Sequence, residues 1–336
     1  MASILEDVVL LDSLSWEEIE DALLHESLDG CHKRSNSDAS HSQIWGLDEE
    51  RAKLEFRFEK KDIAAIRIAL RIPDKMRTQH GVTLTGEEAL CVTLRRLAYP
   101  NRLCGLELLF GHHPSTLSLI SNAVVTHIDS TFGHLLLSET LTPLTNCWGL
   151  IDGTARAICR PSEDQKIYFS GHKRYHALKY QSVMCPNGLI VRLDGPYEGR
   201  KHDAGILRAS GLYGDLEKLM DRMEGHYVLY GDPAYPLLPL LQRPYVSASV
   251  SPQQKDFNKA MSTVRQCVEW GFGKIIAEFA FLDFKKNQKL RLHQVAKMYK
   301  AATILCNCHT CLYGSQTTQY FGVAPPTLEE CLVPRQ

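Results

Sequence analysis

The order of short apolar runs and helical segments after residue 145 constrains the fold of this 336-residue chain more than any other feature. A helical segment from His202 to about Ser210 interrupts a series of runs rich in β-branched and aromatic residues. Long helices are predicted from about 254 to 281 and from about 292 to 312. Turn residues bound each of four predicted strands, CWGLIDGT, YHALKYQSVMC, GLIVRLDGP and HYVLYGDPAYP. This order predicts an α/β domain over residues 145–312, in which helices pack on a mixed sheet.

Residues 51–140 have the periodicity of an all-helical region. Three helices are expected between about 85 and 128: GEEALCVTLRRLA before Pro100, a short one around LCGLELLF that ends at Gly111, and one that begins HPSTLSLI. Three short helices with a tight second turn suggest a helix-turn-helix. Its third helix would present Ser115, Thr116, Ser118 and Asn122 to a DNA groove. The alternative is a plain helical domain that only packs against its neighbour.

Acidic and basic residues are distributed unevenly along the chain. Residues 1–50 hold a third of the 39 acidic residues but only two basic ones, Lys33 and Arg34, so the rest of the chain is basic. A basic body suits a polyanionic partner, although an ordinary uneven surface gives the same balance. We expect residues 1–50 to be an acidic, disordered segment, with a short amphipathic pattern from Leu10 to Leu23, and residues 313–336 to be a C-terminal tail. Scattered cysteines in apolar contexts indicate reduced core thiols, and nothing in the sequence indicates a membrane.

Two aspartates follow apolar runs in the predicted sheet. Asp152 ends the run WGLI, and Asp232 follows YVLY after a single glycine. A buried carboxylate is costly unless it binds a cation, and Mg²⁺ prefers oxygen ligands of this kind. Two acids at the ends of two central strands are therefore candidates for one metal site.

Two further acids are expected on helices. Glu269 borders the apolar stripe of its helix, where an exposed ion pair with Arg265 is the alternative interpretation. Asp203 begins a helix, where an aspartate is commonly a residue of the first turn favoured by the helix dipole. The predicted order of elements brings both helices to one edge of the sheet.

These motifs resemble those of the Harbinger-type DDE transposases and their domesticated relatives, over residues 84–312. The similarity covers a helix-turn-helix segment and five successive blocks: IDGT at 151–154, YFSGHKRYHALKYQ at 168–181, GRKHD at 199–203, GDPAYP at 231–236 and RQCVEWGFG at 265–273. The resemblance implies a ribonuclease H-like fold and a nuclease in the nucleus. It assigns Asp152, Asp232 and Glu269 to the catalytic triad and Asp203 to a further metal ligand.

The resemblance also implies an activity and its partners. Two divalent cations, Mg²⁺ or Mn²⁺, would support hydrolysis of DNA phosphodiester bonds or strand transfer. Lys173, Arg174 and Lys179 are candidate phosphate contacts. His202 could assist Asp203, although such a histidine also suits a structural hydrogen bond. A separate Myb-like protein would supply DNA recognition, because Leu119 replaces the basic residue that follows the STxS run in the family, and a homodimer is possible.

Other interpretations remain open at this point. A catalytically silent, domesticated DNA-binding or protein-interaction module would keep the acids without turnover. The CNCHTC run at 306–311 invites a zinc site, but it lacks a second, distant ligand pair, and packed thiols at the end of a helix are the alternative. The basic run at 284–293 suits a nuclear localisation signal, a contact to the DNA backbone or an ordinary solvated helix face.

Overall fold

The computed structural model describes residues 46–77, 81–132, 146–222, 225–246, 249–290 and 293–332. Most of the acidic segment at 1–50, including the pattern from Leu10 to Leu23, lies outside these residues. Residues 42–336 form one unit by their internal contacts. Within the described ranges, no helix is both long and apolar enough to cross a membrane.

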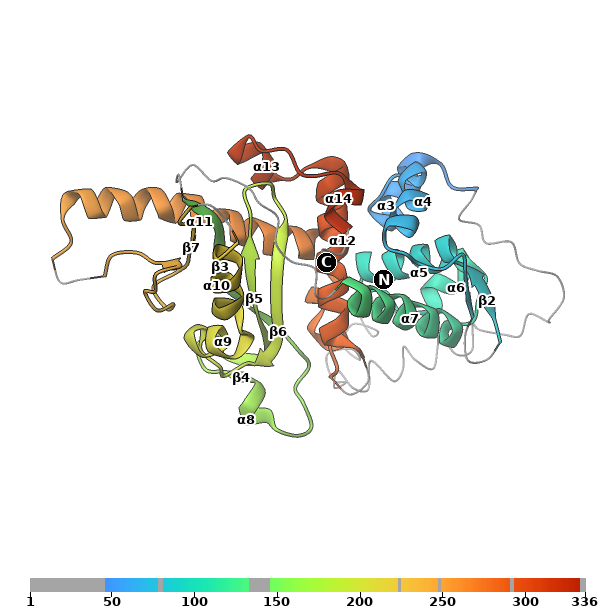
Figure 1. The fold of residues 1–336 in the computed structure, drawn as a ribbon. Coiled ribbons are helices and arrows are strands. Elements are labelled where there is room, and N and C mark those ends of the chain that lie inside the picture. The colour runs from blue at the N-terminus through green and yellow to red at the C-terminus, as the bar shows by residue number, and fades with distance from the viewer. Residues whose placement is uncertain are drawn as a thin grey trace, which may run out of the picture. The chain divides into compact units, whose positions relative to one another are not determined.

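A six-stranded mixed sheet forms the centre of the second half of the chain (Figure 1). Strands β3, β5 and β6 are antiparallel neighbours with β5 in the middle, and β4 pairs with the first residues of β5. On its other side β3 is parallel to β7, and β7 is parallel to β8. The strands are β3 (Cys147–Ala157), β4 (Phe169–Ser170), β5 (Tyr175–Met184), β6 (Ile190–Glu198), β7 (Val228–Tyr230) and β8 (Leu241–Gln242).

Helices cover both faces of this sheet. Successive residues of β3 point to opposite faces, so each face has apolar side chains that pack against helices. Leu150 packs in an apolar cluster with Phe272 of α11, whereas Ile151 packs in a second cluster with Leu207 of α9. Helix α12 lies in the first cluster and α10 in the second. The helices of this half are α8 (Gln165–Tyr168), α9 (Asp203–Ser210), α10 (Leu212–Met220), α11 (Pro252–Glu278), α12 (Val295–Tyr313), α13 (Gln316–Phe321) and α14 (Leu328–Leu332). Two short 3-10 helices, η2 (Ala280–Asp283) and η3 (Lys285–Asn287), follow α11.

The longest helix, α11, begins with a reciprocal capping arrangement. The Ser251 hydroxyl accepts a hydrogen bond from the backbone N–H of Gln254, and the Gln254 side chain accepts one from the backbone N–H of Ser251. Pro252 occupies the first helical position, where its missing N–H is no loss. The helix then buries Val268, Phe272 and other residues against the sheet, which fixes the faces of its remaining side chains.

The first half of the described chain is mainly helical. Its elements are α3 (Glu49–Phe56), α4 (Lys60–Ala69), β1 (Lys75–Arg77), β2 (Thr83–Thr85), α5 (Gly86–Ala98), α6 (Cys104–Phe110) and α7 (Pro114–Phe132). The Thr85 hydroxyl caps α5 by accepting from Glu88 N–H, and Gly111 ends α6 in the left-handed conformation. Helix α7 packs on α5 and α12. Several side-chain contacts join this half to the other. Arg96 lies over the Phe281 ring, the Thr126 hydroxyl bonds to Gln294, and the Tyr313 hydroxyl donates to Asp62.

Most predicted elements are confirmed, including the three helices between 85 and 128. The third, α7, buries Leu117, Ile120, Val124 and Ile128 on one face. The interpretation of residues 51–140 as all-helical is wrong at one place. Strands β1 and β2 form an antiparallel pair there, and three-residue strands are too short to show a period of two. Gly86 is needed beside them, because a Cβ would lie 2.1 Å from the carbonyl oxygen of Pro73.

The cysteines and the C-terminal residues complete the fold. The ten cysteines of the described residues are free thiols, and six of them are buried, as the apolar contexts predict. Residues 313–332 include α13 and α14, and Leu332 of α14 is buried in the main apolar cluster. In its described residues, 284–290 and 293, the basic run contains the 3-10 helix η3 and no α-helix.

Candidate functional site

Asp152 lies in β3, where the strand passes from buried to partly exposed residues. Leu150 and Ile151 before it are fully buried. Its Oδ1 accepts a 2.8 Å hydrogen bond from the backbone N–H of Gly153, and its Oδ2 lies 2.8 Å from Nη1 of Arg265. The strand therefore carries a carboxylate to the place where the sheet meets α11.

The environment of Asp152 favours its protonated form. Its pKa is raised to about 6, chiefly by burial, and the neighbouring carboxylates of Asp232 and Asp203 contribute to the rise. The Arg265 guanidinium and the Gly153 N–H act in the opposite direction. The three aspartates are thus close enough to influence one another electrostatically.

Asp232 reaches this place from the neighbouring strand. It follows β7 after Gly231, and β7 runs parallel to β3 with Tyr230 opposite Leu150. Its Oδ1 accepts a 3.0 Å hydrogen bond from the backbone N–H of Ala234, which turns the chain away from the sheet. Because the two strands are parallel neighbours, Asp232, just past the end of β7, lies beside Asp152. The prediction that Asp152 stands at a strand end is wrong, because β3 continues to Ala157 in its pairing with β5.

Asp203 approaches from the helix that follows β6. It is the first residue of α9, with His202 as its exposed N-cap residue. A Cβ on Gly153 would lie 2.8 Å from Oδ1 of Asp203, so the absence of a side chain at Gly153 gives Asp203 its space. Lys179 of β5 lies near it, with Nζ 3.8 Å from Oδ1, and donates to the backbone carbonyl of Lys201.

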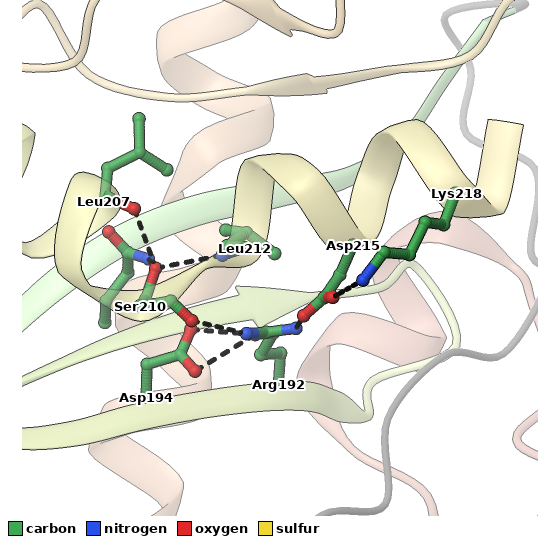
Figure 2. Close-up of polar contacts among 8 residues, drawn as sticks. Arg192, Asp194, Leu207, Ser210, Leu212, Asp215 and Lys218 are labelled. Carbon is green, nitrogen blue, oxygen red and sulfur yellow. Dashed lines mark hydrogen bonds and ion pairs between the residues drawn. The ribbon is translucent and has the colours of Figure 1, made fainter.

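The other end of α9 is held to the sheet by Arg192 of β6 (Figure 2). Its guanidinium donates to both oxygens of Asp194, to Asp215 of α10 and to the backbone carbonyl of Ser210. Ser210 is the last residue of α9, and its hydroxyl accepts from Leu212 N–H at the start of α10. Arg192 therefore fixes the corner between the two helices, and with it the position of α9.

Tyr235 is a residue of this site that the sequence reasoning did not single out. It is fully buried, and its hydroxyl has no hydrogen-bond partner among the described residues. Burial raises the pKa of Tyr235 well above its usual value, and the carboxylates of Asp203, Asp152 and Asp232 add to the effect. The GDPAYP block contains Tyr235, but an aromatic residue in such a run has the pattern of an ordinary core residue.

Glu269 does not share these contacts. It is exposed on α11, one helical turn after Arg265, and Arg265 pairs with Asp152 instead of with Glu269. Glu269 lines a pocket of about 550 Å³ together with Met184, Gly188, Lys274 and other residues of α11, α12 and α13. The structure therefore brings Asp152, Asp203 and Asp232 together and places Glu269 beside a different hollow.

The candidate DNA contacts fall in two regions. Lys173 and Arg174 are exposed in the turn between β4 and β5, whereas Lys179 is engaged beside Asp203. On α7, Ser115 is exposed, with its hydroxyl 2.8 Å from Nδ1 of His113. The other three residues named on this helix, Thr116, Ser118 and Asn122, are partly exposed.

The CNCHTC run does not form a metal cluster in the described structure. Cys306 and Cys308 are buried, and Cys311 has Cys331 of α14 as its hydrogen-bond partner. Nε2 of His309 lies 3.6 Å from Glu278, and burial lowers the pKa of His309 to about 3. Packing of thiols and an imidazole in the core therefore accounts for this run.

The aspartate group suits a divalent cation by its chemistry. It offers hard carboxylate oxygens, and a cation would offset both the burial of the Asp152 charge and the repulsion from Asp232 and Asp203, which together raise the pKa of Asp152. No three Asp, Glu, His or Cys side chains of the described ranges are arranged around a common point as metal ligands. The Arg265 guanidinium occupies one oxygen of Asp152 in this state.

Comparisons with known proteins agree with this geometry. Residues 151–307 match the DDE superfamily endonuclease family. Over 226 residues the chain is 26% identical to Protein ALP1-like of Arabidopsis thaliana, an alignment that covers 60% of this chain and 55% of the relative. The chain thus spans about half the length of this curated relative, and no solved structure matches it significantly. Residues 151–307 of this chain are therefore similar to the DDE superfamily endonuclease family.

Proposed function

We propose that this protein is a metal-dependent DNA endonuclease derived from a transposase. The observation that carries the proposal is the meeting of Asp152 and Asp232 at the edge where β7 ends beside the middle of the parallel strand β3, with Asp203 beside them. The match of residues 151–307 to the endonuclease family supports the same activity. The strand order β6-β5-β3-β7-β8 supports a ribonuclease H-like fold, in which such an edge carries the catalytic carboxylates.

Asp152 and Asp232 would hold a divalent cation, Mg²⁺ or Mn²⁺, with Asp203 and Glu269 as further ligands. When bound, such cations lower the pKa of an attacking water or 3′-hydroxyl and stabilise the leaving oxygen of the phosphodiester. In the absence of a cation, Arg265 supplies the positive charge that holds the Asp152 carboxylate in place. Lys179 keeps Asp203 oriented at the start of α9 and adds positive charge for a phosphate.

DNA recognition would divide between two regions. Helices α5, α6 and α7 would act as a helix-turn-helix in which Ser115, Thr116, Ser118 and Asn122 of α7 face a groove. These side chains offer hydrogen bonds but no positive charge, so the affinity would need Lys173, Arg174 and a separate Myb-like DNA-binding protein. A protein that acts on DNA would be located in the nucleus. We also propose that the protein carries out strand transfer and forms a homodimer.

Nicking of supercoiled plasmid in Mg²⁺ or Mn²⁺ tests the proposal. Wild-type protein should convert the plasmid to the open circle, and Asp152→Asn, Asp232→Asn and Glu269→Gln should abolish the conversion. Asp221→Asn is the matched control, because Asp221 is exposed at the end of α10. Equal nicking by wild type and the Asp152→Asn variant would assign the activity to a contaminating nuclease.

A second function is favoured by one observation, the pairing of Arg265 with Asp152 while Glu269 lies beside another pocket. Such a site suits a catalytically silent, domesticated module that binds DNA or another protein. This alternative predicts DNA or partner binding that is the same in EDTA and in Mg²⁺, together with no nicking. Metal-dependent nicking that disappears in the aspartate variants excludes it.

A further inference from the structure

Two basic segments that are far apart in the sequence lie together at the end of the β3–β5 ladder. The first is the turn 171–174 between β4 and β5, where Arg174 N–H donates to the Ser170 carbonyl and Arg174 has a left-handed φ of 57°. The second is the segment 284–289, which contains η3. Figure 1 shows β4 and α8 at one end of the long strands.

Hydrogen bonds join these segments through the residues that follow β3. Ile158 N–H donates to the carbonyl of His176, and Cys159 N–H donates to the carbonyl of Gln288. Gln288 is buried, and its side chain donates to the Phe281 carbonyl, so the second segment is held in place. The pKa of His176 is lowered by burial and then by the cations of Arg160 and Lys285, which places both cations near its ring.

The surface made by these segments combines cations with exposed phenyl rings. Phe169 and Phe284 are each 41% exposed, and the Phe169 ring meets His176 edge to face at 5.5 Å. In the two segments and the residues next to them, 160–169 and 283, exposed basic residues outnumber the exposed acids Glu163, Asp164 and Asp283. The basic residues are Arg160, Lys166, Lys173, Arg174, Lys285, Lys286 and Lys289. We call this set, with the two phenylalanines, the β4–η3 surface.

We propose that the β4–η3 surface binds unpaired DNA next to the aspartate site, an inference that rests on the proposed nuclease function. A duplex hides the faces of its bases along its length, so exposed phenyl rings among cations suit unpaired bases that stack on them. The ladder runs five residues from Asp152 to Ala157, about 17 Å at the usual rise of a strand. Lys179 lies opposite Ala155 in this ladder, so its positive charge lies between the two places.

Fluorescence anisotropy in EDTA tests this surface apart from catalysis. The probes are a labelled duplex with a single-stranded tail of about ten nucleotides and a blunt duplex of the same paired length. Phe169→Leu keeps an apolar side chain but removes the ring. It should weaken binding of the tailed probe about fivefold or more and leave the blunt probe unchanged. Tyr320→Leu is the control, because Tyr320 is exposed to a similar degree on α13.

The charge of the surface is tested separately. The double variant Lys173→Gln, Lys285→Gln should weaken binding of the tailed probe and flatten its salt dependence by about one to two in the logarithmic slope. Lys255→Gln, on the exposed side of α11, removes a charge elsewhere and should change neither. These side chains are exposed, so the variants should fold even where Phe169→Leu does not.

The outcomes separate the two proposals. Unchanged affinity of both surface variants for the tailed probe overturns the β4–η3 surface, whatever the plasmid assay shows. Equal losses on tailed and blunt probes for Phe169→Leu also overturn it, because the ring then has no selectivity for unpaired bases. Tail binding through Phe169 in a protein that does not nick plasmid contradicts only the proposed nuclease function.

Discussion

Nη1 of Arg265 lies 2.8 Å from Oδ2 of Asp152, so helix α11 places a cation on the central carboxylate of the sheet. Asp232 and Asp203 add negative charge at the same place. The contact joins the longest helix to β3 across 113 positions of the sequence. The protonation of Asp152 can therefore be measured through the pH dependence of stability, and the effect of Arg265 through metal binding.

The raised pKa of Asp152 predicts a pH-dependent stability. Its folded-state pKa of about 6 exceeds the ordinary value of 3.8, so the folded protein favours the protonated form. The corresponding stability is complete below about pH 4 and is lost as the pH rises through 6. Asparagine cannot ionise, so Asp152→Asn should raise the free energy of unfolding at pH 7.5 by about 2–3 kcal/mol, and the gain should vanish near pH 4.

Urea denaturation at both pH values measures this difference. Asp221→Asn, at an exposed position, provides the control and should change stability little at either pH. A loss of stability in the Asp152→Asn variant that is equal at pH 4 and pH 7.5 contradicts the raised pKa.

Removal of Arg265 should favour a metal ion at Asp152. A guanidinium and a divalent cation compete for the same carboxylate oxygen, so Arg265→Ala should bind Mn²⁺ more tightly than wild type, by about fivefold or more. Mn²⁺ binding is followed by electron paramagnetic resonance or calorimetry without DNA. Lys255→Ala, in the first turns of the same helix, is the matched control. Weaker Mn²⁺ binding by Arg265→Ala would show that Arg265 supports the site and does not compete with the cation.

The sequence predicts the main elements of the sheet well because long apolar runs have few alternative structures. It predicts both Asp152 and Asp232 at strand ends, but Asp152 lies in the middle of β3. Their meeting depends on the parallel pairing of β3 and β7, which local pattern does not reveal. Strand β8 has only two residues and no periodicity of its own. The antiparallel pair β1–β2 was missed for the same reason.

The faces of α11 show the limit of helical patterns. Arg265 and Glu269 are four residues apart, so both border the same apolar stripe and either could face the sheet. Only the packing of Val268 and Phe272 decides that Arg265 reaches Asp152. Tyr235 was missed because its place among three carboxylates arises from elements that meet only in the fold.

The contacts that Arg192 makes with Asp194, Asp215 and Ser210 should contribute strongly to stability. Arg192→Ala would leave Asp194 unpaired where burial already raises its pKa, and loss of one partner of a buried ion pair costs about 3–5 kcal/mol. Urea denaturation at pH 7.5 should show this loss, and a smaller loss at pH 4, where Asp194 takes up a proton. Arg200→Ala removes an exposed pair with Glu198 and should cost less than about 0.5 kcal/mol. Similar losses in the free energy of unfolding for the two variants contradict the stabilising role of the Arg192 contacts.

A side chain at Gly153 should damage the site more than the fold. The Cβ of Gly153→Ala would lie 2.8 Å from Oδ1 of Asp203, so the Asp203 carboxylate must rotate away from Asp152. We expect plasmid nicking to fall about tenfold or more, because small displacements of catalytic groups have large kinetic effects. The free energy of unfolding should change by less than about 1 kcal/mol, because an end of a flexible side chain can move.

Gly214→Ala is the control for this substitution. Gly214 lies in α10 with no atom near its added Cβ, so alanine should stabilise the helix by about 0.5–1 kcal/mol without changing nicking. Nicking and urea denaturation of the two variants together separate displacement of Asp203 from general destabilisation. Full nicking by Gly153→Ala would mean that the position of Asp203 next to Asp152 does not matter for the reaction, and Asp203 would then lose its place among the proposed metal ligands.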